Sequence, residues 1–365
     1  MSTADGVAII LVVAMTLYAC SGLADFGAGV WDLTAGGRES GRQPRALIDA
    51  AVTPVWEVNH VWLIFMLILT WTAFGPAFAS IMTTSFVPLT LAAVGIVLRG
   101  ASFAVRKDAA RAGGRHLAGW LFGIGSVLTP FCLGMTLGAL MTGRIPLSGT
   151  ATAPTADPGT SWVTVTAVLV GLLAVATGAF VAACYLVAEA HRRGLPATEA
   201  WFRVRARVAG VAGLVLGVAA LTALYVDQRR MFDLLVKRGW PLLVIGVLAL
   251  GATFWLAARS RDRVRRRGIR PAAVVGVAAL VWAWAVAQYP YLLPFTLTIE
   301  DGAGAAATMR WVLAWSAVAV VLVGPALVVL YSLDQKDHLG EDPTTSRETA
   351  PVGSSEPVGE VVTDP

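Results

Sequence analysis

Long runs of apolar residues, separated by short polar segments, make up most of the chain. Each run reaches about 20 residues, the length that a helix needs to cross about 30 Å of hydrocarbon. The runs lie near residues 6–31, 50–74, 77–99, 117–141, 162–189, 204–225, 239–258, 271–290 and 308–331. This pattern predicts an all-α membrane protein with nine transmembrane helices, because a bilayer accepts a backbone only when its polar groups are paired internally.

Polar segments divide the predicted helices into groups. The expected organisation is a first four-helix unit over residues 1–141, an external linker over 142–161, a second four-helix unit over 162–290, an external loop over 291–307 and a ninth helix over 308–332. Residues 333–365 are rich in Pro, Ser, Thr, Asp and Glu and have no apolar periodicity. Such a composition cannot bury enough surface to offset chain entropy, so it predicts a disordered tail.

Lys and Arg are unequally shared between the two sides that nine alternating helices would define. Of the 28 basic side chains, 22 fall on the side of the loop with Arg38, Arg42 and Arg45, and 6 fall on the other. The positive-inside bias therefore predicts an external N-terminus and a cytoplasmic C-terminus. Topology accounts for the net charge of +5, and no nucleic-acid partner is expected, because the basic residues fall in the short loops between apolar runs.

Composition agrees with a membrane protein, since 56% of the residues are hydrophobic and only 14% are charged. The first apolar run has no basic leader and is longer than a secretory h-region, so we expect it to remain as a helix. Cys20, Cys132 and Cys184 are widely separated within apolar runs. Their spacing suits neither a disulfide framework nor a metal site, and we interpret them as small buried hydrophobic residues.

Two carboxylates within the predicted helices are the main candidates for chemistry. Asp25 lies near the inner end of the first helix and Glu57 about two turns into the second, so both are expected at similar depth on the cytoplasmic side. Ionisable groups in a membrane are costly and commonly functional. Desolvation can move a carboxyl pKa toward neutrality, which predicts a proton relay inward from the cytoplasm. The alternative is that each acid only hydrogen-bonds a neighbouring helix.

Glu57 belongs to a conspicuous segment, Trp56-Glu57-Val58-Asn59-His60-Val61-Trp62. Glu57 and His60 are three residues apart, as in di-iron bundles, but such a site needs a second pair. The remaining histidines are expected in cytoplasmic loops or the tail: His116, His191 and His338. We therefore expect no metal or haem ligand here, and a hydrogen-bonding core role for His60. Trp56, Asn59 and Trp62 are candidate supporting or interface residues.

Two further features carry candidate roles. Arg99, which ends the third predicted helix, is deeper than the other basic residues and is expected to pair with an acid. The external segment from Tyr289 to Asp301 contains two prolines and three aromatic residues. Such a stiff interfacial loop suits a lipid-facing anchor, a lid near a quinone or a contact with another subunit, and these three readings stay open.

Several segments, in this order, carry a resemblance to a known family. They are Asp25-x-Gly27-x-Gly29, Pro54 to Leu63, Leu98 to Arg106, Trp120 with Gly125-Ser126, Ala183 to Leu186, Tyr289-Pro290 through Thr298-Ile299, and Pro325 with Tyr331. Together they resemble subunit II of cytochrome bd-type quinol oxidases. The resemblance implies a multi-pass protein of the bacterial cytoplasmic membrane that pairs with a haem-bearing subunit I, and allows a small accessory subunit.

The resemblance also implies functions. Subunit I would hold two b haems and one d haem, oxidise quinol and reduce oxygen to water, while this chain would bind no haem and would not be catalytic alone. Asp25 and Glu57 fall on the positions of the family's proton-path carboxylates. Two departures from the family's usual pattern suggest a divergent member, for which a cyanide-insensitive type is one option: Glu57-Val58 replaces Asp-Gly, and Gly22-Leu23-Ala24 replaces an upstream Asp-Gly-Phe.

Two alternatives remain from different classes. The first is a proton-coupled secondary transporter, in which Asp25 and Glu57 would couple protons to a solute. Transporters tend to have inverted repeats and helices broken near the midplane, and the sequence has neither a visible repeat nor acids at that depth. The second is a structural scaffold that keeps the partner subunit but gives the carboxylates only a packing role.

Overall fold

The computed structural model describes most of the chain as helices. Backbone is described for residues 2–37, 39–52, 56–108, 112–147, 157–259 and 268–335, without the side chains of residues 52, 56–58, 103–104, 106–108, 112–116, 259, 323–324 and 326–335. The predicted disordered tail therefore lies almost entirely outside the described residues. The chain divides into two compact units, residues 1–315 and 316–365.

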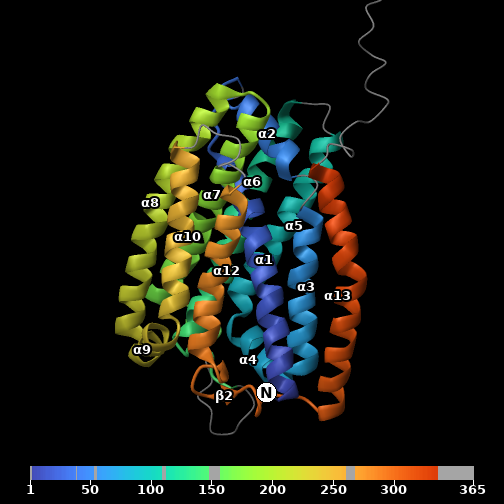
Figure 1. Cartoon of the computed structure of the whole chain (residues 1–365), viewed down its shortest axis with the longest axis vertical. Coiled ribbons are helices and arrows are strands. Elements are labelled where there is room, and N and C mark those ends of the chain that lie inside the picture. Colours follow the sequence, from blue (N-terminus) through green and yellow to red (C-terminus); the bar gives the residue numbers. More distant parts are fainter. Residues whose placement is uncertain are drawn as a thin grey trace, which may run out of the picture. The chain divides into compact units, whose positions relative to one another are not determined.

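Twelve helices and one hairpin are described (Figure 1). The helices are α1 (Thr3–Leu33), α2 (Arg42–Val52), α3 (Trp56–Ala73), α4 (Gly75–Thr84), α5 (Phe86–Asp108), α6 (Ala112–Met141), α7 (Val165–Arg192), α8 (Pro196–Asp227), α9 (Arg229–Arg238), α10 (Trp240–Arg259), α12 (Ile269–Gln288) and α13 (Ala306–Gln335). Strands β1 (Tyr291–Leu293) and β2 (Leu297–Thr298) form an antiparallel hairpin within the predicted external loop.

The apolar runs become helices of membrane-spanning length. Six described helices are long and apolar enough to cross a membrane, and α4 with α5 would make a seventh if that bent pair is one span. Two shorter apolar stretches lie in α3 and α13, at Asn59–Ala73 and Ala306–Leu322. The multi-pass character is thus confirmed, whereas the count of nine spans, their orientation and the two four-helix units stay predictions.

The predicted third helix, residues 77–99, is broken in the structure. Helices α4 and α5 meet at Ser85 with a bend of 84°. Pro88 lies in the first turn of α5, where it has no N–H to donate, and in a continuous helix its ring would clash with the carbonyl of Thr84. Pro76 similarly occupies the first turn of α4. The apolar run alone could not indicate this break, but the two prolines could.

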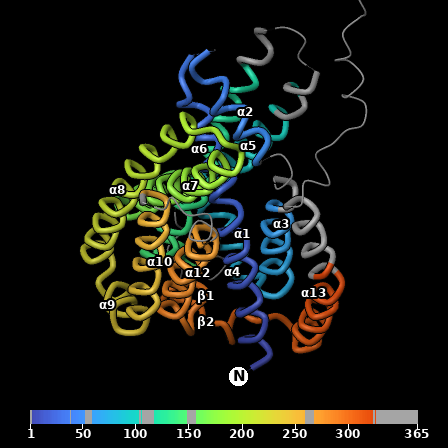
Figure 2. The backbone as a smooth tube through the Cα atoms, turned by 45° about the horizontal axis from the view of Figure 1, so that its top comes forward, coloured from blue at the N-terminus to red at the C-terminus, as the bar shows by residue number. Residues whose placement is uncertain are grey.

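Helix α1 is the element against which the others pack. It contacts α2, α3, α6, α7 and α12, and two views show it between α12 and α3 (Figures 1 and 2). A Cβ atom at Gly27 would lie 1.9 Å from the carbonyl oxygen of Gly178 in α7, and one at Gly29 would lie 1.9 Å from Ser126 Oγ in α6. The glycines of the Asp25 segment therefore allow close helix approach.

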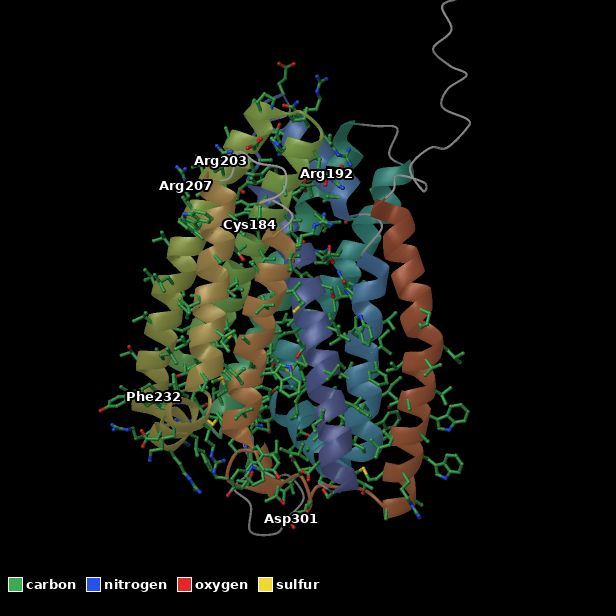
Figure 3. All side chains as sticks on the ribbon, viewed as in Figure 1. Cys184, Arg192, Arg203, Arg207, Phe232 and Asp301 are labelled. Carbon is green, nitrogen blue, oxygen red and sulfur yellow. The ribbon has the colours of Figure 1, made fainter. Side chains whose placement is uncertain are left out.

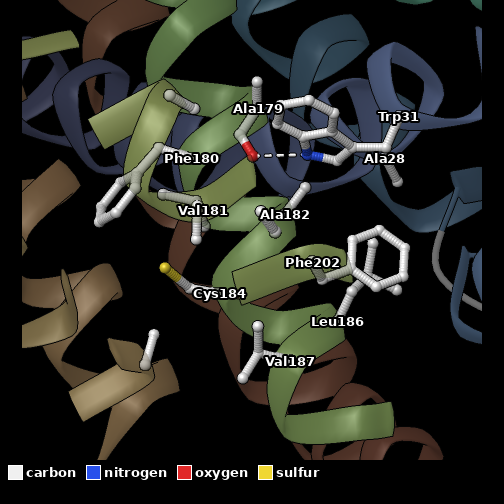
Figure 4. Close-up of a cluster of buried hydrophobic side chains, with 14 of the residues drawn as sticks. Ala28, Trp31, Ala179, Phe180, Val181, Ala182, Cys184, Leu186, Val187 and Phe202 are labelled. Atoms are coloured by element: carbon white, nitrogen blue, oxygen red, sulfur yellow. Dashed lines mark hydrogen bonds between the residues drawn. The ribbon is translucent and has the colours of Figure 1, made fainter. Parts of the chain in front are cut away.

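A cluster of buried side chains joins α1 and α7 to α8 (Figure 4). Phe180, Cys184 and Phe202 lie in this cluster, and Cys184 is fully buried. Trp31 Nε1 donates a hydrogen bond of 2.8 Å to the carbonyl oxygen of Ala179, so an indole at the end of α1 is fixed to the backbone of α7.

Replacing Trp31 with phenylalanine is expected to lower the free energy of unfolding by about 1–3 kcal/mol, because a buried hydrogen bond and part of a buried ring are lost. Thermal or denaturant unfolding of the detergent-solubilised protein measures this. Trp311, which is 65% exposed, provides the control, since Trp311→Phe removes the same atoms from an exposed position. Equal effects of the two substitutions would contradict the stabilising role given to the buried indole of Trp31.

Charged residues segregate toward the ends of the helices. Arg192, Arg203 and Arg207 lie at one end and Asp301 at the other (Figure 3). At the arginine-rich end, Glu189 accepts hydrogen bonds from Arg192 and Arg193, and Glu199 accepts one from Arg203 and lies 3.1 Å from His191 Nδ1. The same end carries α2, whereas the N-terminus, α9 and the hairpin lie at the opposite end (Figure 1).

Candidate functional site: a buried ion pair at a four-helix junction

Asp25 and Arg99 form an ion pair inside the helical unit. Arg99 Nη2 lies 2.5 Å from Asp25 Oδ1, and the two side chains are 0% and 2% exposed, respectively. Asp25 comes from α1 and Arg99 from α5, 74 positions later in the chain. An isolated charge at such a place would be strongly unfavourable, so each charge is tolerated because the other compensates it.

Two more helices hold the ion pair in place. Arg99 Nη1 donates to Ser126 Oγ of α6 at 2.5 Å, and Ser126 Oγ in turn donates to the carbonyl oxygen of Phe122. Asn59 Nδ2 of α3 donates to Asp25 Oδ2 at 3.2 Å. Both carboxylate oxygens are therefore engaged, and polar contacts connect α1, α3, α5 and α6 at one point.

Aromatic rings enclose the guanidinium group. Its central carbon lies 4.6 Å from the centroid of Phe26 and 4.7 Å from that of Phe122, distances at which a cation is attracted to a ring face. His60 of α3 packs edge-on against Phe26, with ring centroids 6.2 Å apart. The site is therefore a polar centre within an aromatic and apolar shell, which strengthens the electrostatic interactions inside it.

Some polar atoms around the pair have no hydrogen-bond partner within the described part of the chain. They are Asn59 Oδ1, Arg99 Nε and the hydroxyl oxygen of Tyr18. Buried polar groups are nearly always paired in proteins, with ordered water where no side chain is available. The site thus has unused hydrogen-bonding capacity at Asn59 and Arg99, and a further buried hydroxyl at Tyr18 lies about two turns before Asp25 on α1.

The structure brings together four of the seven candidate residues: Asp25, Asn59, His60 and Arg99. The pairing of Arg99 with an acid was expected, and Asp25 is that acid. Trp62 is half-buried farther along α3. Trp56 and Glu57 lie in the first turn of α3, but their side chains are outside the described residues, so whether Glu57 approaches Asp25 stays a prediction.

Sequence reasoning missed a further buried acid, Asp32. It lies seven residues after Asp25 on α1, is 2% exposed, and has Arg45 Nε of α2 at 3.8 Å from Oδ1. A spacing of seven places both acids on one helix face, and this signal was available in the sequence. Ser126 was also missed as a partner of Arg99, because a serine in an apolar helix gives little indication of what it will contact.

A separate cavity of about 980 Å³ lies toward the N-terminal end of α1. Apolar side chains of α1, α3, α4 and α12 line most of it, and Tyr289, Tyr291 and Ile299 contribute from the hairpin region. The predicted external loop therefore borders a large apolar space. The three interpretations of that loop, as anchor, lid or subunit contact, stay open.

Within the described ranges, no three side chains among His, Cys, Asp and Glu gather in a way that could hold a metal ion. Of the two histidines whose side chains are described, His60 and His191, only His60 belongs to the junction.

Long apolar helices around a desolvated ion pair define a multi-pass membrane protein with a polar centre at a helix junction. The chain belongs to the cytochrome bd terminal oxidase subunit II family, whose model matches residues 4–334. The resemblance seen in the sequence is thereby confirmed.

Individual relatives agree with this family. The chain is 28% identical over 119 residues to cytochrome bd ubiquinol oxidase subunit 2 of Bacillus subtilis (strain 168), and this match spans 33% of the chain and 34% of the relative, about a third of its length. The fold of the present chain is similar to that of a chain in the structure of bd oxidase from Geobacillus thermodenitrificans. The TM-score is 0.75 and the sequence identity 23%, and the match covers 91% of the present chain and 98% of the other.

Proposed function

We propose that this chain is the haem-free subunit II of a bd-type terminal quinol oxidase in the bacterial cytoplasmic membrane. In this role it completes a heterodimer with a haem-bearing subunit I and lines a path for proton uptake from the cytoplasm. The complex would couple quinol oxidation to the reduction of oxygen to water. Membrane lipid surrounds the pair, and a small accessory subunit is a further partner.

The observation that carries the proton-path proposal is the junction around Asp25. A carboxylate, a guanidinium, an amide and a hydroxyl from four helices form one connected polar group inside the membrane unit. Polar residues at such depth are costly and typically serve ion or proton movement. The family match supplies the reaction that would consume the protons.

Each residue has a distinct task in this proposal. Arg99 keeps Asp25 in place and compensates its charge, while Asn59 orients the second carboxylate oxygen. Glu57, two positions before Asn59 in α3, would take protons at the cytoplasmic side and pass them toward the junction through hydrogen-bonded groups. Haems b and d of subunit I would carry the electrons from quinol to oxygen.

A transporter has less support. The break between α4 and α5 is of the kind on which transporters rely. However, Arg99 lies about 20 Å along α5 from that break, given a rise of 1.5 Å per residue. The polar junction and the discontinuous backbone are therefore separate, whereas a transporter would combine them in one binding site.

Replacing Glu57 with glutamine tests the proposal, because the amide keeps the size but cannot carry a proton. In the purified two-subunit complex we expect oxygen consumption and proton uptake to fall by about tenfold or more, with haem content unchanged. Glu300→Gln, at an exposed position after the hairpin, is the matched control.

Unchanged oxygen consumption and proton uptake in the Glu57 variant would remove the proton-path proposal and leave the scaffold role. If no haem-bearing subunit co-purifies with the wild-type chain, the oxidase role itself would be wrong.

A further inference from the structure

Tyr18 occupies the midpoint of the 31-residue helix α1. It precedes Asp25 by seven positions, just as Asp25 precedes Asp32, so the three titratable side chains share one face of the helix. Seven residues correspond to about 10 Å along the axis. With the predicted orientation, Tyr18 lies deeper in the membrane than Asp25.

The contacts around Tyr18 extend toward the ion pair. A Cβ atom at Gly22 would lie 3.4 Å from the Tyr18 ring and 3.7 Å from the Phe26 ring, so a residue without a side chain separates the two rings. Phe26 is the ring that faces Arg99. This face of α1 therefore leads from Tyr18, past Gly22, directly to the guanidinium of the junction.

The hydroxyl of Tyr18 is buried yet unpaired. The residue is 9% exposed, and its hydroxyl oxygen has no hydrogen-bond partner among the described residues. A buried hydroxyl without a partner is unfavourable, and the usual solution in proteins is an ordered water molecule.

Two groups of the junction share this property with the phenol, and both contact Asp25, which lies on the same face of α1 as Tyr18. Arg99 Nε is a donor, Asn59 Oδ1 an acceptor, and the phenol both a donor and an acceptor. A bound water can make two to four hydrogen bonds to such groups. The chemistry of the set is therefore that of a small internal water site.

We propose that Tyr18 is a positioning residue that holds water between its hydroxyl and the junction of Asp25, Arg99 and Asn59, and extends the proton path to the middle of α1. The phenol hydrogen-bonds this water and fixes its position, so that protons pass along the water while the phenol keeps its own proton. This inference rests on the proposed function of the junction.

Tyr18→Phe removes the hydroxyl and keeps the ring. In the purified complex we expect kcat for oxygen reduction to fall by about tenfold, while KM for quinol is unchanged. A tenfold change is what the loss of one hydrogen bond that stabilises the transition state would cause. The solvent deuterium isotope effect on kcat is expected to rise, because proton delivery becomes slower. If Tyr18 had only a packing role, its replacement would neither lower kcat selectively over KM nor change the isotope effect.

Tyr185→Phe is the matched control, because Tyr185 is a half-buried tyrosine of α7 beside Arg270 rather than at the junction. Rates are referred to haem content, so that a loss of assembly cannot imitate a loss of turnover. If Glu57→Gln slows turnover and Tyr18→Phe does not, the role of Tyr18 is wrong and the proton-path proposal stands. If neither slows turnover, both the role of Tyr18 and the proton-path proposal are wrong, and the scaffold role remains.

Discussion

Replacing Asp25 with asparagine is expected to destabilise the protein by about 3–5 kcal/mol, because Arg99 is then left as a buried charge without a partner. The Arg99 side chain is 0% exposed and cannot reach bulk water without local unfolding. Ser126 and the two phenylalanine rings stay in contact with it, but they do not carry a compensating charge. Denaturant unfolding of the purified chain or complex measures the loss.

A double variant separates the stability of the pair from its role in proton movement. Asp25→Leu combined with Arg99→Met removes both charges and keeps similar volumes, and such replacements of buried pairs are often neutral or stabilising. We therefore expect the double variant to recover most of the stability that Asp25→Asn loses. If its proton uptake stays normal, the pair has only a structural role.

The surface pair of Arg229 and Asp233 on α9 provides the control for this prediction. These side chains are 58% and 41% exposed, and Arg229 Nε lies 3.1 Å from Asp233 Oδ1. Asp233→Asn makes the same chemical change as Asp25→Asn, but the charge that remains is solvated. We expect a much smaller loss of stability for Asp233→Asn. A loss as large as that of Asp25→Asn would show that the buried, uncompensated charge of Arg99 is not the cause of the destabilisation.

Gly27→Ala is expected to have the second large effect, about 3 kcal/mol or more of lost stability, because a new methyl group would overlap the backbone of α7. The Cβ atom would lie 1.9 Å from the carbonyl oxygen of Gly178 and 2.7 Å from the nitrogen of Ala179. These are main-chain atoms, so no side-chain rotation can relieve the overlap. Helices α1 and α7 would have to separate.

Gly213→Ala in α8 is the matched control, because no atom lies within 4 Å of the Cβ that it adds. There we expect no loss, or a small gain from helix propensity. Comparing thermal unfolding and haem content of the two complexes distinguishes them. Equal stability of both variants would show that α1 and α7 are not in the close contact described.

Much of the helical architecture could be predicted from the sequence. A long apolar run in a membrane protein has to form a helix, because a helix pairs its backbone polar groups within the segment itself. The elements that differ reflect local chemistry within apolar runs. Pro88 separates α4 from α5, and the predicted run at 50–74 becomes the end of α2 followed by α3. Helix α9, which is amphipathic and only 10 residues long, was hidden in a short polar connection.

The candidate site was predictable in its members but not in its contacts. Asp25 and Arg99 stood out because charges are rare in apolar segments. Their geometry depends on helices that are 34 and 74 positions from Asp25, and no periodicity along one segment encodes which helix will face which. Tyr18 and Ser126 are ordinary in an apolar helix, so only their three-dimensional surroundings give them significance.

The glycines of α1 have a mechanical consequence. Because the backbone of α1 touches α7 at Gly178 and its surface touches α6 at Ser126, sliding or rotating α1 would break contacts on two sides at once. Packed interiors of this density deform little. Asp25 therefore occupies a fixed point in a rigid frame, and any opening or closing that regulates access to it must come from the surrounding helices rather than from α1.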